Sequence, residues 1–247
     1  MKTFVQSELL LKSGAVNAVS LRVEDKPNFF SMRLNGTPGI AETGNRKEFF
    51  SALGFDESLV VCGEQVHGDS IAFVDSPGFY PRTDALVTAK KNLLLAVSVA
   101  DCVPILIFDK RAKVAAAVHA GWRGTVKNIV AKTLGFLLDE FNSKPDDVVA
   151  FIGPSAGTCC YEVGEEVAKN FSDGFVKESL RPDKFMLDLK AANLEQLVGR
   201  GIPKENVEIN EHCTICDANL HSFRRDGESS GRMLASIAIK QETPCAE

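Results

Sequence analysis

Three apolar runs between residues 93 and 118 constrain the fold of this chain most strongly. Leu93–Ala100 is almost continuously apolar, as a strand buried on both faces requires. Ile105–Phe108 and Val114–Val118 are two further strand-like runs, and the polar pair Lys110-Arg111 separates them. The segment therefore predicts neighbouring strands inside a layered core.

The rest of the chain alternates strand-like and helix-like segments. Two more strands are expected at Leu59–Cys62 and Ser70–Val74. Helices are expected at Arg46–Leu53, Gly124–Phe141, Glu162–Phe171, Leu189–Val198 and Met233–Lys240. Thr125 is the expected N-cap of the second of these helices, and Asp188 that of the fourth. This mixed order predicts an α/β sandwich with mixed sheets rather than a regular βαβ array.

Composition and charge narrow the class of protein. The 247 residues are 45% hydrophobic and 25% charged, which is typical of globular domains. Loop-like stretches at 35–39, 76–83 and 222–231 are too short for interdomain linkers, so residues 1–247 are expected to form a single domain. A net charge of −5 without a Lys/Arg block argues against a nucleic-acid partner. No signal peptide or membrane span is recognisable, so a cytoplasmic location is expected, and no protein partner is implied.

A cysteine and a histidine flank the central hairpin. If Lys110 and Arg111 formed a two-residue turn, Cys102 would lie opposite His119, with their Cβ atoms about 5 Å apart. Two chemistries use this pair: a thiolate nucleophile with a histidine base, or a metal ion bound by sulfur and nitrogen. His67, beside Gly68, is the candidate third metal ligand.

The remaining cysteines give weaker signals. Cys213 and Cys216 form a Cys-x-x-Cys pair with His221 downstream, but no second such pair exists, and we expect them to bind no metal. Cys159 and Cys160 are adjacent and poor disulfide partners, so burial is the expectation for both.

Three arginines are candidates for binding an anion. Arg123 follows the sole tryptophan, Trp122, between two glycines, and its guanidinium is a fork-shaped donor for phosphate or carboxylate. Arg224 and Arg225 form a second cationic pair in the late loop; a solvated turn is the alternative for them.

Six sequence blocks together resemble the YfiH/YlmD laccase-domain family. The blocks are Gln65–Gly68, Ala100–Pro104, His119–Gly124, Cys159–Gly164, Ser222–Gly227 and Gly231–Met233. They span about residues 60 to 238, and the His-Ala-Gly-Trp-Arg-Gly and Ala-Asp-Cys blocks are the most specific. His221 departs from the family, which has an aromatic residue at that position.

The resemblance implies an α/β/β/α sandwich and a zinc ion bound by His67, Cys102 and His119. It also implies phosphorolysis of the purine nucleosides adenosine, inosine and methylthioadenosine, with a side activity in adenosine deamination. Asp101 is then the candidate acid/base or an orienting group, and the arginines are candidates for binding phosphate. Members have also been labelled copper-dependent polyphenol oxidases, although four histidines in the whole chain are few for multicopper chemistry.

We therefore expect a zinc-dependent purine nucleoside phosphorylase. Besides the copper-dependent polyphenol oxidase, two alternatives stay open. One is a thiol hydrolase with Cys102 as nucleophile and His119 as base, acting on peptidoglycan-related amides. The other is a metal-binding protein without turnover.

Overall fold

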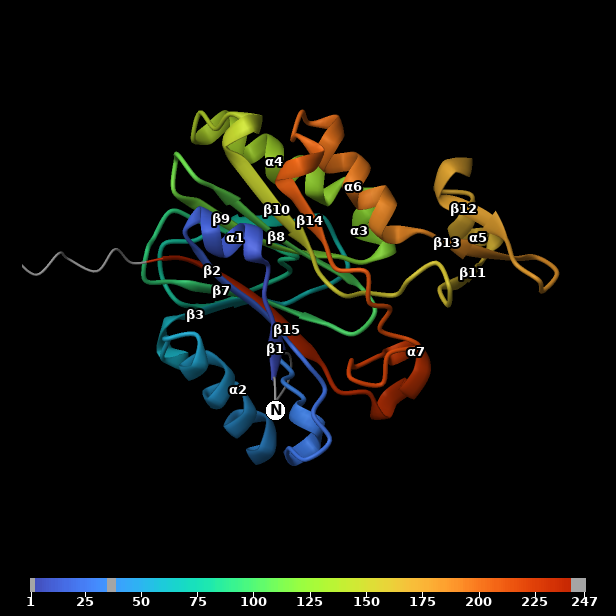
Figure 1. The fold of residues 1–247 in the computed structure, drawn as a ribbon, viewed down its shortest axis with the longest axis horizontal. Helices are drawn as coiled ribbons and strands as arrows, with labels where there is room; N and C mark the ends of the chain where they lie inside the picture. Colours follow the sequence, from blue (N-terminus) through green and yellow to red (C-terminus); the bar gives the residue numbers. More distant parts are fainter. Residues whose placement is uncertain (1–2, 35–38, 241–247) are drawn as a thin grey trace, which may run out of the picture.

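The computed structural model describes residues 3–34 and 39–240. Two six-stranded sheets stack face to face, with helices on their outer faces (Figure 1). The first sheet has the order β1 (Phe4–Val5), β2 (Ala15–Ser20), β15 (Met233–Ile239), β7 (Leu94–Val99), β3 (Val60–Gly63), β5 (Gly78–Tyr80). The second has the order β14 (Val207–Ile209), β10 (Val148–Ile152), β8 (Val103–Asp109), β9 (Val114–Ala120), β6 (Ala85–Thr88), β4 (Ile71–Phe73).

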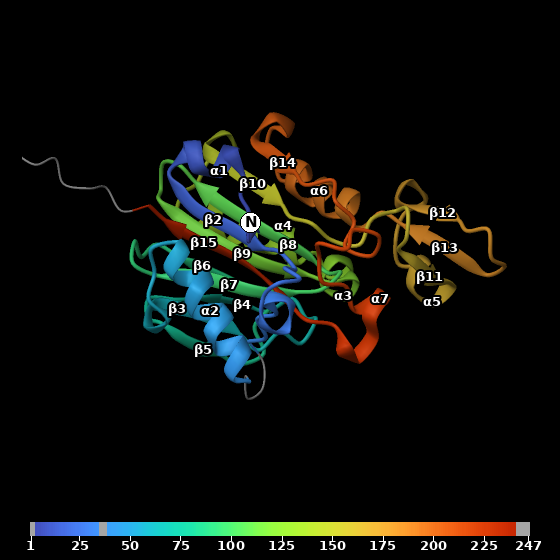
Figure 2. The same ribbon diagram turned by 60° about the horizontal axis from the view of Figure 1, so that its bottom comes forward.

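Helices and a small third sheet complete the fold. The helices are α1 (Glu8–Ser13), α2 (Ile40–Ala52), α3 (Trp122–Val126), α4 (Ile129–Glu140), α5 (Glu165–Ala168), α6 (Leu189–Gly199) and α7 (Phe223–Asp226). The third sheet has the order β11 (Glu162–Gly164), β13 (Lys184–Leu187), β12 (Val176–Glu178), and with α5 it protrudes at one end of the molecule (Figure 2). Both large sheets contain parallel and antiparallel neighbours, so the predicted α/β/β/α sandwich with mixed sheets is confirmed.

Strand β7 shows how the apolar runs build the layers. Leu95 and Val97 point into the core between the two sheets, whereas Leu94 and Ala96 pack under α2 on the outer face. Strand β8 alternates in the same way between the inner core and the core beneath α4 and α6. Successive side chains thus enter different cores, which is why these strands are apolar throughout.

Two predicted helices are wrong. Met233–Lys240 is not a helix: Met233–Ile239 is strand β15, paired with β2 and β7 in the middle of the first sheet. Glu162–Phe171 contains strand β11 and only a four-residue helix, α5. The first error has a simple cause, since periodicity does not distinguish a short apolar run in a strand from one in a helix.

The predicted helix Gly124–Phe141 is interrupted. Asn128 has φ 61° and separates α3 from α4, for which it is the N-cap. Thr125 lies inside α3 rather than capping a long helix. Asp188 does cap α6, accepting a hydrogen bond from the Ala191 N–H, as predicted.

The central hairpin differs in its turn from the prediction. Residues 110–113 form a four-residue connection, and Asp109 pairs with Val114. His119 therefore lies opposite Pro104, two residues along from the predicted partner Cys102. A shift of two residues keeps side chains on the same face, so the inferred proximity of Cys102 and His119 survives.

The loop prediction for residues 35–39 falls mostly on residues 35–38, which lie outside the described residues. The stretch 76–83 contains β5, and the stretch 222–231 contains α7. Among the residues described, none of the helices has both the length and the apolar composition needed to cross a membrane.

Candidate metal centre and cleft

The structure brings together the three predicted metal ligands. His119 lies on β9, Cys102 lies between β7 and β8, and His67 lies in the loop that follows β3. One ligand atom from each residue lies within 4.8 Å of the other two. The centroids of the two imidazole rings are 4.9 Å apart, and the ring planes are nearly perpendicular, with an interplanar angle of 79°.

A buried carboxylate, missed by the sequence analysis, organises this centre. Asp84 is fully buried, and its Oδ1 lies 2.8 Å from Nδ1 of His119. Its two oxygens also accept the backbone N–H groups of Val66, His67 and Gly68. Asp84 thereby fixes the histidine ring with Nε2 toward the centre and holds the turn that carries His67 (φ 58°). The only sequence signal is an acidic residue directly before a buried strand.

Gly121 leaves room for the ligands. A Cβ at this position would lie 3.0 Å from Cδ2 of His67 and 3.1 Å from Sγ of Cys102. A side chain at residue 121 would therefore require His67 and Cys102 to shift by a few tenths of an ångström, which accounts for the glycine in the His-Ala-Gly-Trp block.

Charges within the centre favour a thiolate. Burial raises the pKa of Cys102, but the neighbouring His119 charge and hydrogen bonds from both histidines outweigh it and lower this pKa to about 6. Burial lowers the pKa of His119, but the Cys102 thiolate and Asp84 raise it to about 9. Before a metal binds, the pair is thus a thiolate and an imidazolium, and metal binding would release the imidazolium proton.

The donor set fits a catalytic zinc ion. One thiolate and two imidazoles are ligands that Zn²⁺ prefers, and three protein ligands leave a fourth position for substrate or water. The hydrogen bond from Asp84 to His119 is the outer contact that orients a metal-ligating histidine. Imidazole and thiolate also suit copper, so the donors alone do not fix the metal.

The centre opens into a cleft of about 480 Å³. This volume lies within the range of small-molecule sites. Three arginines line the cleft: Arg123, Arg224 and Arg232. Trp122, Tyr161 and Phe223 add aromatic surface. Of these, Arg232 and the last two aromatics were given no role in the sequence analysis.

Asp101 lines the cleft, and its carboxylate accepts hydrogen bonds from two neighbouring segments. It has φ 87°, and its two carboxylate oxygens accept the Thr214 hydroxyl and the Arg224 backbone N–H, both at 2.6 Å. Both oxygens are engaged, so Asp101 positions the loop that carries Arg224.

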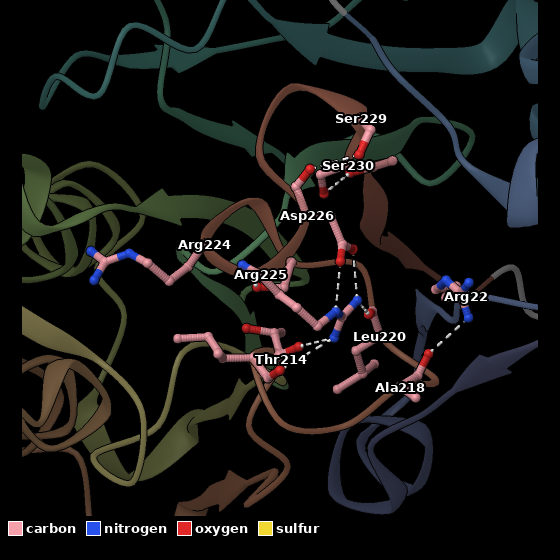
Figure 3. A network of polar contacts seen from close by, with 12 residues as sticks. Arg22, Thr214, Ala218, Leu220, Arg224, Arg225, Asp226, Ser229 and Ser230 are labelled. Atoms are coloured by element: carbon pink, nitrogen blue, oxygen red, sulfur yellow. Dashed lines mark hydrogen bonds and ion pairs between the residues drawn. The ribbon is translucent and has the colours of Figure 1, made fainter.

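Arg225 does not line this cleft. Its guanidinium makes a two-bond pair with Asp226 and donates to the carbonyl oxygens of Thr214 and Leu220. Figure 3 shows the side chain of Arg224 extending away from this network. The adjacent arginines therefore have separate environments: Arg224 faces the cleft, and Arg225 ties its own loop together.

The cysteines outside the cleft are not placed as expected. Cys159, predicted to be buried, is exposed, and it lies with Cys160, Cys213 and Cys216 in one group of thiols within 4.8 Å of one another. His221 does not join this group: its Nε2 lies 3.1 Å from the Phe29 carbonyl oxygen.

Comparison with known proteins identifies the family. The family model described as multi-copper polyphenol oxidoreductase laccase matches residues 40–240. The chain belongs to this family. The resemblance seen in its sequence blocks is thereby confirmed.

Several named relatives align over most of this chain. It is 34% identical to purine nucleoside phosphorylase YlmD of Geobacillus stearothermophilus, covering 93% of this chain and 92% of that protein. It is 34% identical to adenosine deaminase RL5 of an unknown prokaryotic organism, covering 76% and 78%. The crystal structure of YlmD superposes with a TM-score of 0.89 at 31% identity, covering 97% of both chains. Bacillus licheniformis YfiH superposes with a TM-score of 0.88 at 28% identity, again covering 97% of both.

Proposed function

We propose that this chain is a zinc-dependent purine nucleoside phosphorylase. One observation carries the proposal: a single cleft combines the His67, Cys102 and His119 donors with three arginines and an aromatic wall. Phosphorylase relatives that align over nine tenths of the chain support the same reaction. Its substrates would be phosphate and adenosine, inosine or methylthioadenosine.

The arginines would bind phosphate. Arg123 stacks on the Trp122 ring at 4.5 Å, and Arg224 lies 5.3 Å from the Tyr161 ring. The stacked Arg123 guanidinium would offer its edge for two parallel hydrogen bonds to phosphate oxygens. Arg224 donates from one Nη to the Glu162 carbonyl oxygen, so its remaining N–H groups would contact the phosphate. Asp101 would hold Arg224 in place through its hydrogen bond to the Arg224 backbone N–H.

The reaction then balances as a simple displacement. A phosphate oxygen forms a bond to C1′ of the ribose, and the bond from C1′ to N9 breaks. The purine leaves with the bonding electron pair and takes up the proton that hydrogen phosphate loses on forming the ester, and the products are ribose 1-phosphate and the free base. The aromatic side chains of Trp122, Tyr161 and Phe223 would stack on the planar purine.

His67, Cys102 and His119 would hold the metal. When bound, Zn²⁺ supplies Lewis acidity, which polarises an oxygen or nitrogen of the substrate. The same chemistry suits replacement of the purine 6-amino group by water, so adenosine deamination is a second activity, supported by the relative named adenosine deaminase.

Two other functions fit the observations less well. A Cys102 thiolate paired with His119 would also suit a thiol hydrolase, but the adjacent third ligand His67 favours a metal site. A multicopper oxidase needs more histidines than the cleft supplies. Of the other two, His212 pairs with Asp217, and His221 contacts the Phe29 carbonyl.

The test is the phosphate dependence of adenine release from adenosine by the purified protein. We expect ribose 1-phosphate and adenine in equal amounts, no release without phosphate, and loss of turnover in His119→Ala. Arg123→Ala and Arg224→Ala should mainly raise the KM for phosphate, whereas the control Arg111→Lys, at the far end of the central hairpin, should leave it unchanged. A covalent substrate adduct on Cys102, detected by mass spectrometry during turnover, would instead establish the thiol hydrolase.

A further inference from the structure

Four cysteines that the proposed reaction does not use converge where the protruding sheet joins the body. Cys159 and Cys160 precede β11, and Cys213 and Cys216 lie between β14 and α7. All four Sγ atoms lie within 4.8 Å of one another. We propose that they form a second, structural Zn²⁺ site, closed by four thiolates and separate from the centre in the cleft. This proposal replaces the expectation from sequence that Cys213 and Cys216 bind no metal, because the fold adds Cys159 and Cys160 to that pair.

The spacing of the sulfurs suits one shared cation. A tetrahedral zinc with Zn–S bonds of about 2.3 Å requires its sulfurs to be about 3.8 Å apart. The Sγ atoms of Cys159 and Cys216 are 3.8 Å apart. A disulfide between these two would use only half of the cluster, and the adjacent pair Cys159 and Cys160 is a poor disulfide partner. Four sulfurs converging on one point match the closed coordination of structural zinc.

The surrounding backbone already holds the two cysteine loops together. The Gly157 N–H donates to Sγ of Cys213 at 3.2 Å, a contact that stabilises a thiolate. A Cβ at Gly157 would lie 3.0 Å from Cβ of Cys213, so the close approach depends on this glycine. The Thr214 N–H donates to the Ser155 carbonyl oxygen, in a bridge between the two loops.

A buried cation lies close enough to balance the charge. Four thiolates around Zn²⁺ carry a net negative charge, which needs a positive neighbour. Lys190 is 7% exposed and donates from Nζ to the carbonyl oxygens of Asn210 and His212, so its charge lies beside the residue that precedes Cys213.

The position of the cluster gives the ion a role. Tyr161, directly after Cys160, lines the cleft, and Thr214, directly after Cys213, donates its hydroxyl to Asp101. An ion at the cluster would therefore fasten the protruding sheet to the body and hold two segments that shape the cleft. It would act on the fold and not on the substrate.

The experiment is a count of zinc bound to the protein, purified with a reductant and supplied with Zn²⁺, by native mass spectrometry. Wild type should carry two ions per chain, Cys216→Ser one, and His119→Ala the one in the cluster. Cys62→Ser is the matched control, because Cys62 lies on β3 away from the cluster, and it should keep both. When Co²⁺ is bound to the His119→Ala variant, we expect intense sulfur-to-cobalt charge-transfer absorption. The double variant His119→Ala/Cys216→Ser should lose this absorption.

Alkylation of the wild type provides a test that needs no variant to fold. Bound zinc should protect Cys159 and Cys216, both exposed, and a chelator should make them reactive. One zinc per reduced wild-type chain that is absent from His119→Ala would overturn the proposal. So would the mass deficit of a disulfide joining these cysteines under the same reducing conditions, or iron in place of zinc.

Discussion

Replacing Asp84 by Asn tests how the metal centre is held. The carboxylate accepts four hydrogen bonds: Oδ1 from the His67 N–H (3.0 Å) and His119 Nδ1 (2.8 Å), and Oδ2 from the Val66 (3.2 Å) and Gly68 (2.8 Å) N–H groups. An amide has one oxygen, so in either orientation its NH₂ group faces two donors.

The expected loss follows from this count. Hydrogen bonds to a charged group contribute about 1.5–3 kcal/mol each. Losing two therefore costs about 3–6 kcal/mol, divided between folding stability and metal binding. Because Asp84 orients His119, we expect metal affinity to fall about 10–100-fold, the range typical of such outer contacts.

The assay is competition for zinc with a chromophoric chelator, together with urea unfolding of the zinc-free protein. Asp109→Asn is the matched control: Asp109 is equally buried at the far end of the same hairpin. Its Oδ1 accepts the backbone N–H groups of Arg111 and Ala112, and its Oδ2 has no hydrogen-bond partner. An asparagine can therefore keep both hydrogen bonds through its one oxygen. Zinc affinity within twofold of wild type in Asp84→Asn would refute the reasoning.

Three further predictions concern single residues. Gly121→Ala should lower zinc affinity about 5- to 150-fold, because overpacking costs about 1–3 kcal/mol; calorimetry with unchanged affinity would contradict this. Cys102 should be alkylated slowly in the zinc-bound protein and faster after chelation, since its pKa of about 6 leaves it a thiolate at neutral pH. Peptide mapping after brief labelling measures the alkylation rate, and equal rates in the two forms would exclude metal ligation by Cys102. Burial lowers the pKa of His221 to about 4, so stability should fall by about 2–3 kcal/mol as pH drops from about 6.5 to 4.5, where the unfolded imidazole is protonated and the folded one is not. His221→Phe should remove that acid sensitivity in urea titrations, and an unaltered pH dependence would argue against it; the Phe29 carbonyl keeps the Val23 N–H as donor.

The layers of the fold could be predicted from sequence because their signals are local. Leu93–Ala100 is apolar at every position except Ser98, and such a run is typical of a strand that is covered on both faces. Met233–Ile239 is also apolar, but its seven residues suit a helix or a strand equally well. What decides is the pairing with β2, more than 200 residues earlier in the chain, and no local pattern reports such pairing.

The residues of the site likewise divide into those that a local pattern predicts and those that depend on long-range contacts. The hairpin places Cys102 and His119 on one face even with the turn misjudged, since the shift was even. Asp84 could not be singled out, because its role depends on a loop that folds back from residues 66–68. Arg224 and Arg225 are neighbours in sequence, yet only the fold shows that the second is consumed by carbonyls and Asp226.

The thiol cluster was missed for a related reason. Its two halves, Cys159-Cys160 and Cys213-x-x-Cys216, are separated by more than 50 residues, and each alone is a weak metal signature. Contacts made in the folded chain, such as the bridge between Ser155 and Cys213 and the hydrogen bond from the Gly157 N–H to Cys213 Sγ, bring them together.

The most direct test of the central claim is the rate of ribose 1-phosphate formation from adenosine and phosphate, measured against zinc occupancy of the His67, Cys102 and His119 centre. Titrating zinc into chelated Cys216→Ser protein, which should bind zinc only in the cleft, with occupancy followed by mass spectrometry, gives both quantities in one series. The account predicts no ribose 1-phosphate at zero occupancy and a rate proportional to occupancy up to one ion in the cleft. Full turnover by zinc-free protein, or a fully occupied centre that releases no purine in the presence of phosphate, would contradict it.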